Sequence, residues 1–401
     1  MKDVLIIAHF CDDFESKGNN RFNYIAELLT KDNFSVELIT SDFSHSKKEK
    51  RLAINEKSYN YKITVISEPV YKKNVSLKRF YSHRIMGKNL KKYLQERKQP
   101  DLIYCAVPSL DVSYVAAEHA KKNNIRFIVD IQDLWPEAFE MLFNIPIISN
   151  IIYSPMHKKA NYVYNTADEI IAVSQTYLNR AKEANGNKAK VHSIFIGTEL
   201  KQFDAFASNE TKPKDEVWLA YIGTLGHSYD LTCVIDALAI LKTKGITNLK
   251  FIIMGDGPLR KNFEMYAQAK GIYHEFTGRL SYPDMVALLT KCDIAVNPIV
   301  EKSAASIINK HADYAAAGLP ILNTQKSTEY KDLINQYNAG CNCDNNPQDL
   351  AEKLLILYKD EALRLEQGKN HRKMAEEKFD RANTYPVIKE LLSCSKTKHC
   401  L

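Results

Sequence analysis

Long apolar runs, a cysteine framework and the common metal and dinucleotide motifs are all missing from this chain of 401 residues. No apolar stretch approaches the roughly 20 residues that a membrane-spanning helix needs. The first segment, MKDVLIIAHF, is too short for a secretory signal and leads directly into Asp12 and Asp13. We therefore expect a cytoplasmic protein.

Cysteine is sparse, and the eight cysteines are scattered over positions 11, 105, 233, 292, 341, 343, 394 and 400. This scatter excludes the dense disulfide framework of a small secreted domain. Cys341 and Cys343 form a close pair, and Cys394, His399 and Cys400 gather in the tail. Neither group has the repeated C-x2-C spacing that identifies a zinc site. The sequence predicts no metal and no cofactor.

The formal net charge is only +7, but the basic residues are unevenly placed. Residues 44–100 contain 16 Lys and Arg against 4 acidic residues, with aromatic and aliphatic residues between them, as in KRFYSHRIMGKNLKKYLQERK. The segment is a solvated helix face, a surface for an anionic membrane, or a surface for nucleic acid. No nucleic-acid-binding motif accompanies it, so we favour the inner membrane surface and expect no nucleic acid.

Strand-like and helix-like segments alternate in both halves of the chain. In the first half, strands are predicted at 3–9, 34–40, 101–107, 125–131 and 169–174, with helices at 20–31 and 112–123. In the second half, strands are predicted at 217–223, 249–257, 273–278, 293–299 and 319–324, with helices at 231–245, 260–271, 282–292 and 347–360 and another from residue 301. This alternation predicts two doubly wound, Rossmann-like α/β domains.

A polar stretch at 204–216 separates the two halves. We therefore expect an N-terminal domain over residues 1–200 and a C-terminal domain over residues 214–372. A helix near 375–395 is expected to cross back to the first domain. Each sheet should bind ligands at the carboxyl ends of its strands, so a substrate is expected in a cleft between the domains.

Glycines follow several of the predicted strands, where bare backbone N–H groups can approach an anion. Gly18 precedes the first helix, Gly223 follows the first strand of the second domain, and Gly255 follows the next strand, with Arg260 at the start of a helix. The G-x-G-x-x-G spacing of dinucleotide-binding proteins is absent.

The segment EKSAASIINKHADYAAAGLPIL, from residue 301, carries polar side chains at intervals of three, four and three: Ser303, Ser306, Lys310 and Asp313. On one helix these four share a face, and the helix N-terminus near Ser303 and Ser306 would follow a strand. The combination suits a diphosphate and a hydroxyl-bearing group such as a ribose. The alternative is a salt-bridged pair on an exposed face, but the Ala-rich run before Gly318 favours a tightly packed helix.

The residues DYAAAGLPIL resemble the EAMAAGLPVI signature of retaining GT-B glycosyltransferases of family 4. The segment DIQDLWPEAF is similar to the Asp-Leu-Trp-Pro-Glu segment of bacterial amino-sugar and fucosamine transferases in that family, which build capsule and O-antigen. The resemblance extends over about residues 1–390. It implies the GT-B fold, in which two Rossmann-like domains face a central cleft.

The resemblance also implies roles for individual residues. Asp313 would hold the ribose and Lys310 the diphosphate, Gly18 would approach the donor phosphate or sugar, and Arg279 and Leu280 lie where the family reads the nucleobase.

The chain departs from the family pattern at several places, one of which is Gln132, where the family has a His on the acceptor side. Ala305 stands where the first Glu of the Glu-x7-Glu element is expected, and Glu301 is the candidate to replace it. Thr224 stands where the family has an Arg that supports the leaving group. Lys310, Arg260 and the helix N-terminus would then offset the charge that develops on the diphosphate.

The resulting prediction is a metal-independent, retaining glycosyltransferase. A nucleotide-sugar of the UDP or GDP type binds the C-terminal domain, and an acceptor hydroxyl binds the N-terminal domain near Asp133 and Glu137. These two carboxylates would accept a proton or position the acceptor; alternatively, they cap a turn around Pro136.

The apolar run MLFNIPIISNIIYSP, together with the basic segment, indicates a lipid-linked saccharide acceptor at the inner face of the membrane. This suits a peripheral enzyme of capsule or lipopolysaccharide synthesis. Two alternatives remain. One is an epimerase or hydrolase on the same fold, with Asp12, Asp13 and Glu15 as carboxylates. The other is a nucleotide-sugar-binding subunit without activity.

Overall fold

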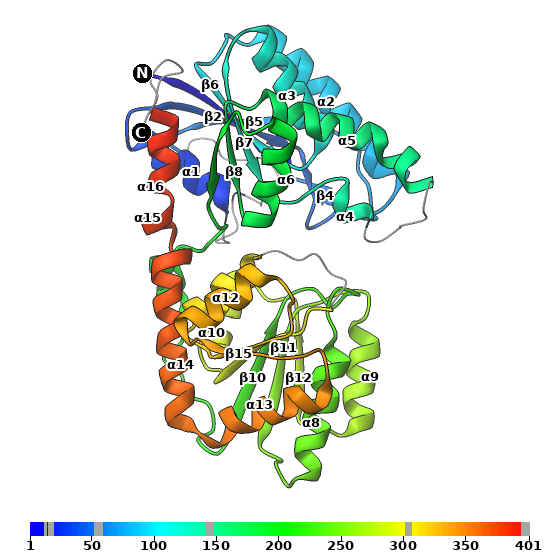
Figure 1. Cartoon of the computed structure of the whole chain (residues 1–401), viewed down its shortest axis with the longest axis vertical. Coiled ribbons are helices and arrows are strands. Elements are labelled where there is room, and N and C mark those ends of the chain that lie inside the picture. Colours follow the sequence, from blue (N-terminus) through cyan, green and yellow to red (C-terminus); the bar gives the residue numbers. More distant parts are fainter. Residues whose placement is uncertain (12–13, 15–19, 52–58, 141–147, 301–306, 394–401) are drawn as a thin grey trace. The chain divides into compact units, whose positions relative to one another are not determined.

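A computed structural model describes residues 1–11, 14, 20–51, 59–140, 148–300 and 307–393. It divides into two compact units (Figure 1). The first unit comprises Met1–Ile194 and the chain from Tyr385 onward, and the second comprises Phe195–Thr384. Each unit is an α/β structure around its own parallel sheet, which confirms the predicted fold class.

The first unit contains, in its described part, a sheet of seven parallel strands in the order β5-β2-β1-β6-β7-β8-β9. Their bounds are β1 (Asp3–Ile7), β2 (Ser35–Ser41), β5 (Lys62–Ile66), β6 (Leu102–Val107), β7 (Arg126–Ile131), β8 (Glu169–Ala172) and β9 (Lys190–Ser193). A small antiparallel pair, β3 (Phe43–Ser44) and β4 (Glu49–Lys50), follows β2. The strand order reverses between β1 and β6, so their carboxyl ends form the expected ligand-binding point.

Helices cover this sheet (Figure 1). Their bounds are α1 (Arg21–Thr30), α2 (Leu77–Glu96), α3 (Leu110–Lys122), α4 (Glu137–Glu140), α5 (Ile148–Thr166), α6 (Gln175–Asn185) and α16 (Pro386–Ser393). Phe22 and Ile25 of α1 and Ile388 and Leu392 of α16 pack into the same buried cluster as the strands. Helix α3 packs against both α2 and α5.

The second unit contains, among its described residues, a sheet of six parallel strands in the order β12-β11-β10-β13-β14-β15. Their bounds are β10 (Val217–Ile222), β11 (Leu249–Met254), β12 (His274–Gly278), β13 (Ile294–Asn297), β14 (Ile321–Asn323) and β15 (Gly340–Asn342). Here the order reverses between β10 and β13, so the carboxyl ends of these two strands mark the second binding point.

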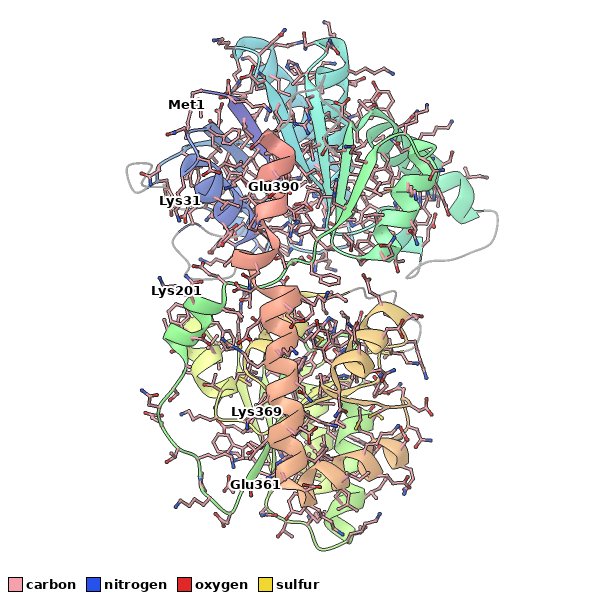
Figure 2. The ribbon with its side chains drawn as sticks, turned by 60° about the vertical axis from the view of Figure 1, so that its left-hand side comes forward. Met1, Lys31, Lys201, Glu361, Lys369 and Glu390 are labelled. Atoms are coloured by element: carbon pink, nitrogen blue, oxygen red, sulfur yellow. The ribbon has the colours of Figure 1, made fainter. Side chains whose placement is uncertain are left out.

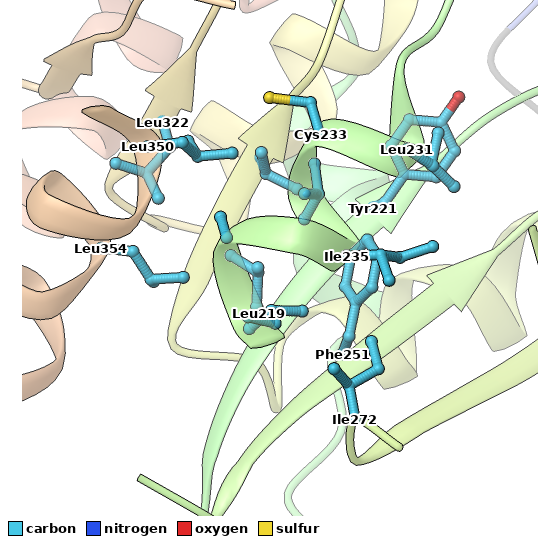
Figure 3. Close-up of a cluster of buried hydrophobic side chains, with 14 of the residues drawn as sticks. Leu219, Tyr221, Leu231, Cys233, Ile235, Phe251, Ile272, Leu322, Leu350 and Leu354 are labelled. Atoms are coloured by element: carbon cyan, nitrogen blue, oxygen red, sulfur yellow. The ribbon is translucent and has the colours of Figure 1, made fainter. Parts of the chain in front are cut away.

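The helices of the second unit bury both faces of its sheet. Their bounds are α7 (Leu200–Phe206), α8 (Leu231–Thr243), α9 (Arg260–Lys270), α10 (Tyr282–Leu289), α11 (Asn309–Ala316), α12 (Thr328–Tyr337), α13 (Pro347–Lys359), α14 (Glu361–Met374), the π-helical turn η2 (Ala375–Phe379) and α15 (Arg381–Thr384). Side chains fill the layers between sheet and helices, and Glu361 and Lys369 mark α14 (Figure 2). In one buried cluster, Leu219 of β10 packs with Ile235 of α8 and Leu354 of α13 (Figure 3).

One predicted boundary is wrong. The helix expected to begin near Ser303 and Ser306 begins at Asn309, after Ile308 in an extended conformation with φ −112° and ψ 169°. The side chain of Ile307 is buried in a core cluster of the second unit, so packing of Ile307 holds the chain in a non-helical path before Asn309. The helix itself is buried, as its alanines predicted.

Candidate functional site

Glycine-bearing loops meet at the carboxyl edge of the second sheet. Gly223 follows β10 with φ +132°, and Gly255 follows β11. A Cβ atom on Gly255 would lie 1.8 Å from the carbonyl oxygen of Gly223, and Gly255 also pairs with Gly278 at the end of β12. The three loops therefore pack backbone against backbone, which requires glycine.

Lys310 of α11 lies directly against the first of these loops. A Cβ atom on Gly223 would lie 3.1 Å from the Nζ atom of Lys310. The same Nζ atom lies 3.7 Å from the ring centroid of Tyr229 and 4.5 Å from that of Tyr221, and it has no hydrogen-bond partner among the described residues. Lys310 is 6% exposed, and burial lowers its pKa well below the usual value. A buried lysine amine without an acceptor is suited to an incoming anion, which would favour its charged form.

Asp313, one turn further along α11, is held by a different neighbour. The hydroxyl of Tyr282 donates a hydrogen bond of 2.9 Å to its Oδ1 atom and lies 3.0 Å from the hydroxyl of Thr198. Burial raises the pKa of Asp313 to about 7, although the bond from Tyr282 opposes the shift. Lys310 and Asp313 are both buried, so they are not a salt-bridged pair on an exposed face.

The other predicted donor-binding residues surround this edge. Arg260 begins α9, donates to the carbonyl oxygen of Phe276 at 3.3 Å and lies 4.0 Å from the carboxylate of Asp256. Thr224 is exposed, and its carbonyl oxygen accepts a bond of 2.8 Å from the hydroxyl of Tyr221. Arg279 is exposed and Leu280 is half-buried, directly after β12.

Several predicted residues lie outside the described residues: Gly18, Glu301, Ser303 and Ser306 in the predicted site, Asp12, Asp13 and Glu15 in the hydrolase alternative, and the first part of the apolar run, 141–147. Sequence reasoning missed Tyr221 and Tyr229, although they flank the Gly223–Gly226 loop closely. Aromatic residues on both sides of a glycine loop were the signal that could have identified them.

The carboxyl edge of the first sheet carries a buried polar network. His9, after β1, lies 2.6 Å through Nδ1 from the hydroxyl of Ser109, which follows β6, and 2.9 Å through Nε2 from Glu68. Ser41 and Ser82 donate to the same carboxylate at 2.5 and 2.6 Å. Burial opposes ionisation of Glu68, but His9 and the hydrogen bonds outweigh it and lower its pKa to about 2.

Asp133 and Glu137 lie after β7, and the structure gives both carboxylates partners within the protein. The carboxylate of Asp133 accepts from the backbone N–H of Leu134 at 3.0 Å and from Nε1 of Trp135 at 3.2 Å, and burial raises its pKa. Glu137 accepts from Nε of Arg180 at 2.5 Å. The contacts of Asp133 with Leu134 and Trp135 are those of a capped turn, whereas Glu137 pairs with Arg180 of α6. A role of either carboxylate toward an acceptor stays a prediction.

Metal-binding and membrane-spanning features are absent from the described part of the chain. No group of three or more His, Cys, Asp or Glu side chains in this part is arranged to hold a metal ion. None of its helices combines the length and apolar character needed to cross a membrane.

Solved structures of known proteins share the fold of this chain. The two parallel-sheet units have the fold of GT-B glycosyltransferases. Anabaena HepE, solved in complex with UDP and glucose, matches at a TM-score of 0.69 and 16% identity, covering 98% of this chain and 100% of HepE. WaaG, a glycosyltransferase involved in lipopolysaccharide biosynthesis, matches at a TM-score of 0.67 and 15% identity, covering 97% of this chain and 99% of WaaG.

Two protein-family models match successive parts of the chain. Residues 19–202 match the family described as Glycosyltransferase Family 4, and residues 202–374 match the family described as Glycosyl transferases group 1. Together, these two matches extend over residues 19–374.

A curated relative also matches part of the chain. An uncharacterized glycosyltransferase of Methanocaldococcus jannaschii is 25% identical over 210 residues, 52% of this chain and 55% of the relative. The chain spans about half the length of the curated relatives it matches.

Proposed function

We propose that this protein is a glycosyltransferase that moves a sugar from a nucleotide-sugar to an acceptor hydroxyl with retention. The observation that carries the proposal is Lys310, a buried ammonium without a hydrogen-bond partner among the described residues, at the strand-order reversal of the second sheet. Its neighbours are a glycine loop and two tyrosine rings, so its amine lies beside backbone of the kind that binds a diphosphate. The UDP complex of HepE, which has the same fold, supports a UDP-type donor.

Each donor group has a proposed partner in the second unit. Lys310 and the backbone around Gly223 and Gly255 hold the diphosphate, and Asp313 accepts from the ribose. Arg279 and Leu280 lie beside the nucleobase. Because Thr224 replaces the expected Arg, Lys310 and Arg260 supply the positive charge that stabilises the departing diphosphate, without a metal.

The first unit is proposed to bind the acceptor, with Asp133 and Glu137 as the carboxylates beside its hydroxyl. A lipid-linked saccharide of capsule or lipopolysaccharide synthesis is the proposed acceptor class, and the fold shared with WaaG is compatible with it. Transfer requires both ligands to meet, so activity needs both units.

Apolar and basic residues share the surface at the start of α2, which supports a peripheral position at the inner membrane face. Leu77 is 87% exposed and Tyr81 is 59% exposed, and Lys72, Lys73 and Lys78 are exposed beside them in sequence. Arg79 does not belong to this surface, because it is buried.

Sedimentation with anionic vesicles at low salt tests this position. Replacement of Lys72, Lys73 and Lys78 by Gln should reduce binding strongly. Replacement of the exposed Lys121, Lys122 and Lys188 removes the same charge from the same unit and should change binding much less. Equal loss in both variants would show that total charge, not this surface, governs binding.

A panel of nucleotide-sugars, each with and without acceptor, tests the proposed reaction. Release of free nucleotide only with acceptor supports transfer, and release without acceptor supports a hydrolase or epimerase. Binding without turnover supports a non-catalytic nucleotide-sugar-binding subunit. The anomeric configuration of the product, read by NMR, tests retention.

A further inference from the structure

A second buried cation lies at the carboxyl edge of the first sheet. Arg79 is in the first turn of α2 and is 7% exposed. Its Cζ atom lies 4.6 Å from the ring centroid of Trp135, 5.5 Å from that of Phe10 and 5.9 Å from that of Tyr71. We call Arg79 and these three rings the Arg79 cage. Aromatic faces stabilise a guanidinium, but they do not neutralise it.

Among the described residues, no carboxylate forms an ion pair with this guanidinium. Nη1 of Arg79 donates to the carbonyl oxygen of Asn74 at 2.6 Å, while Nε has no hydrogen-bond partner in the described part of the chain. The nearby acidic groups are engaged elsewhere: Glu68 by His9, Ser41 and Ser82, and Asp133 by Trp135. Burial lowers the pKa of Arg79. An isolated buried charge is costly unless a counter-ion arrives.

Other nitrogen-bearing side chains lie in the same region, and one of them has an unpaired ring nitrogen. His83 is 1% exposed, its Nε2 atom has no partner among the described residues, and its ring stacks on Trp135 at 5.7 Å. Nζ of Lys48 lies 5.2 Å from the Tyr71 ring centroid and 3.2 Å from Nδ1 of His45. A cavity of about 220 Å³ adjoins the cage. Its lining includes His83, Trp135, Arg84 and Lys159, and also Asp111, which accepts from Nζ of Lys159 at 2.5 Å.

The position of the cage in the fold matches a ligand site. Phe10 follows β1, at the strand-order reversal, and Trp135 follows β7. In open α/β sheets, ligands bind outside the carboxyl ends of strands at such a reversal. The unpaired charge therefore lies where a ligand is expected.

We propose that the Arg79 cage binds an anionic group, a phosphate or a carboxylate, carried by the acceptor. That the ligand is an acceptor rests on the proposed function, but the binding of the anion itself does not require transfer. A planar guanidinium offers two parallel N–H donors, which suits both groups. The source of the anion is a lipid phosphate or a soluble acidic sugar.

Tryptophan fluorescence can report this site directly, because Trp135 and Trp218 are the two tryptophans of the chain. In a Trp218→Phe background, the emission of Trp135 is followed during titration with inorganic phosphate, acetate, phosphatidic acid vesicles or phosphatidylcholine vesicles. A saturable change with phosphate or acetate indicates a soluble source. A change with phosphatidic acid vesicles alone indicates a lipid source, and no saturable change with any anionic probe overturns the proposal.

Variants separate a binding role from a packing role. Arg79→Met should weaken anion binding at least about tenfold, and Arg79→Lys should weaken it less because it keeps the charge but loses the fork. Lys122→Met removes an exposed cation at the other end of the sheet and should bind like the parent. Unchanged affinity in both Arg79 variants would overturn the proposal.

Thermal unfolding supplies a readout that packing alone would not produce. Without anion, Arg79→Met should melt no lower than the parent, because an unpaired buried charge is removed. With phosphate, the parent should gain melting temperature and the variant should not. A variant that melts lower by the same amount with and without phosphate would assign Arg79 to packing. Neither experiment uses a nucleotide-sugar, so failure here is distinct from failure of the proposed transfer.

Discussion

Each sheet has a buried basic side chain at its carboxyl edge, Lys310 in the second unit and Arg79 in the first. The surroundings of these two side chains differ. In the second unit, the ammonium of Lys310 lies under two tyrosine rings and against the backbone of Gly223. In the first unit, the guanidinium of Arg79 lies among three aromatic rings, with His83 close by. Glycine backbone therefore contributes to the surroundings of Lys310, whereas aromatic side chains dominate those of Arg79.

This difference has a physical consequence for the ligands. Glycine loops bring N–H groups close to an anion and suit a diphosphate, which UDP- and GDP-type nucleotide-sugars have in common. Side chains such as Phe10, Tyr71 and Trp135 give a surface whose shape changes with each substitution, which suits an acceptor that differs between enzymes. This contrast supports the proposal that the donor binds the second unit and the acceptor the first.

Removal of the cation of the second unit should cause the greatest loss of activity. Lys310→Met should lower kcat/KM for transfer at least about 100-fold, because the charge that meets the departing diphosphate is lost. Anion binding at the Arg79 cage should not change. The matched control is Lys326→Met, an exposed lysine in the same unit that pairs with Asp344, and steady-state kinetics with the active donor measures both. A loss below about threefold would remove Lys310 from the donor site.

The pH dependence of stability tests the burial of Asp313 beside this cation. Its folded pKa of about 7 exceeds the ordinary value of 3.8, so its contribution to stability is fully present below pH 3.8 and is lost as the pH rises through about 7. Relative to Asp313→Asn, the parent should lose about 2 kcal/mol of unfolding free energy between pH 5 and pH 7. Urea unfolding at both pH values measures this, and parallel profiles would contradict it.

The aromatic support of Lys310 is tested by changing one ring. Tyr229→Leu should weaken binding of a nucleoside diphosphate about tenfold, because the ring that lies 3.7 Å from Nζ is lost. Tyr229→Phe keeps the ring and should bind within about twofold of the parent. Calorimetric titration measures both. Equal losses in the two variants would mean that the hydroxyl, rather than the ring, supports the site.

A milder change concerns the hydroxyl of Tyr221. Tyr221→Phe keeps the ring over Lys310 but removes the bond of 2.8 Å to the carbonyl oxygen of Thr224. The free energy of unfolding, measured by urea titration, should fall by about 1 kcal/mol, and nucleotide affinity should change by less than about threefold. If nucleotide affinity falls by more than about threefold while the free energy of unfolding changes little, this bond positions the loop for the ligand.

The sequence predicts much of the fold but not all of its elements. Apolar runs such as those of β1 and β10 identify strands, because both faces of a parallel sheet are buried. Helix α2 is not among the predicted helices, because cations dominate residues 44–100. Its buried positions Met86, Leu90 and Leu94 do recur every four residues, and this helical period is present beneath the charge.

The candidate site is predictable where its signal is local. Gly223 directly follows one predicted strand, and the helix that carries Lys310 follows another. Parallel strands end at the same edge of a sheet, so both residues could be placed at one edge. His9, Glu68 and Ser109 lie far apart in sequence, and only the pairing of β1 with β6 brings two of them together. In the charge pattern, Arg79 is one more surface cation. Arg79 is buried because it shares a helix face with His83 and Met86. A count of charges does not reveal this shared face.

The affinity of a nucleoside diphosphate for Lys310→Met is the decisive measurement for the proposed donor site. Calorimetry is performed on the parent and on the variant with UDP and with GDP, and the tighter ligand of the parent is compared. Loss of the unpaired ammonium should weaken that ligand at least about tenfold, as expected for a charge-assisted contact. Equal dissociation constants for the parent and Lys310→Met would contradict the assignment of the donor diphosphate to Lys310.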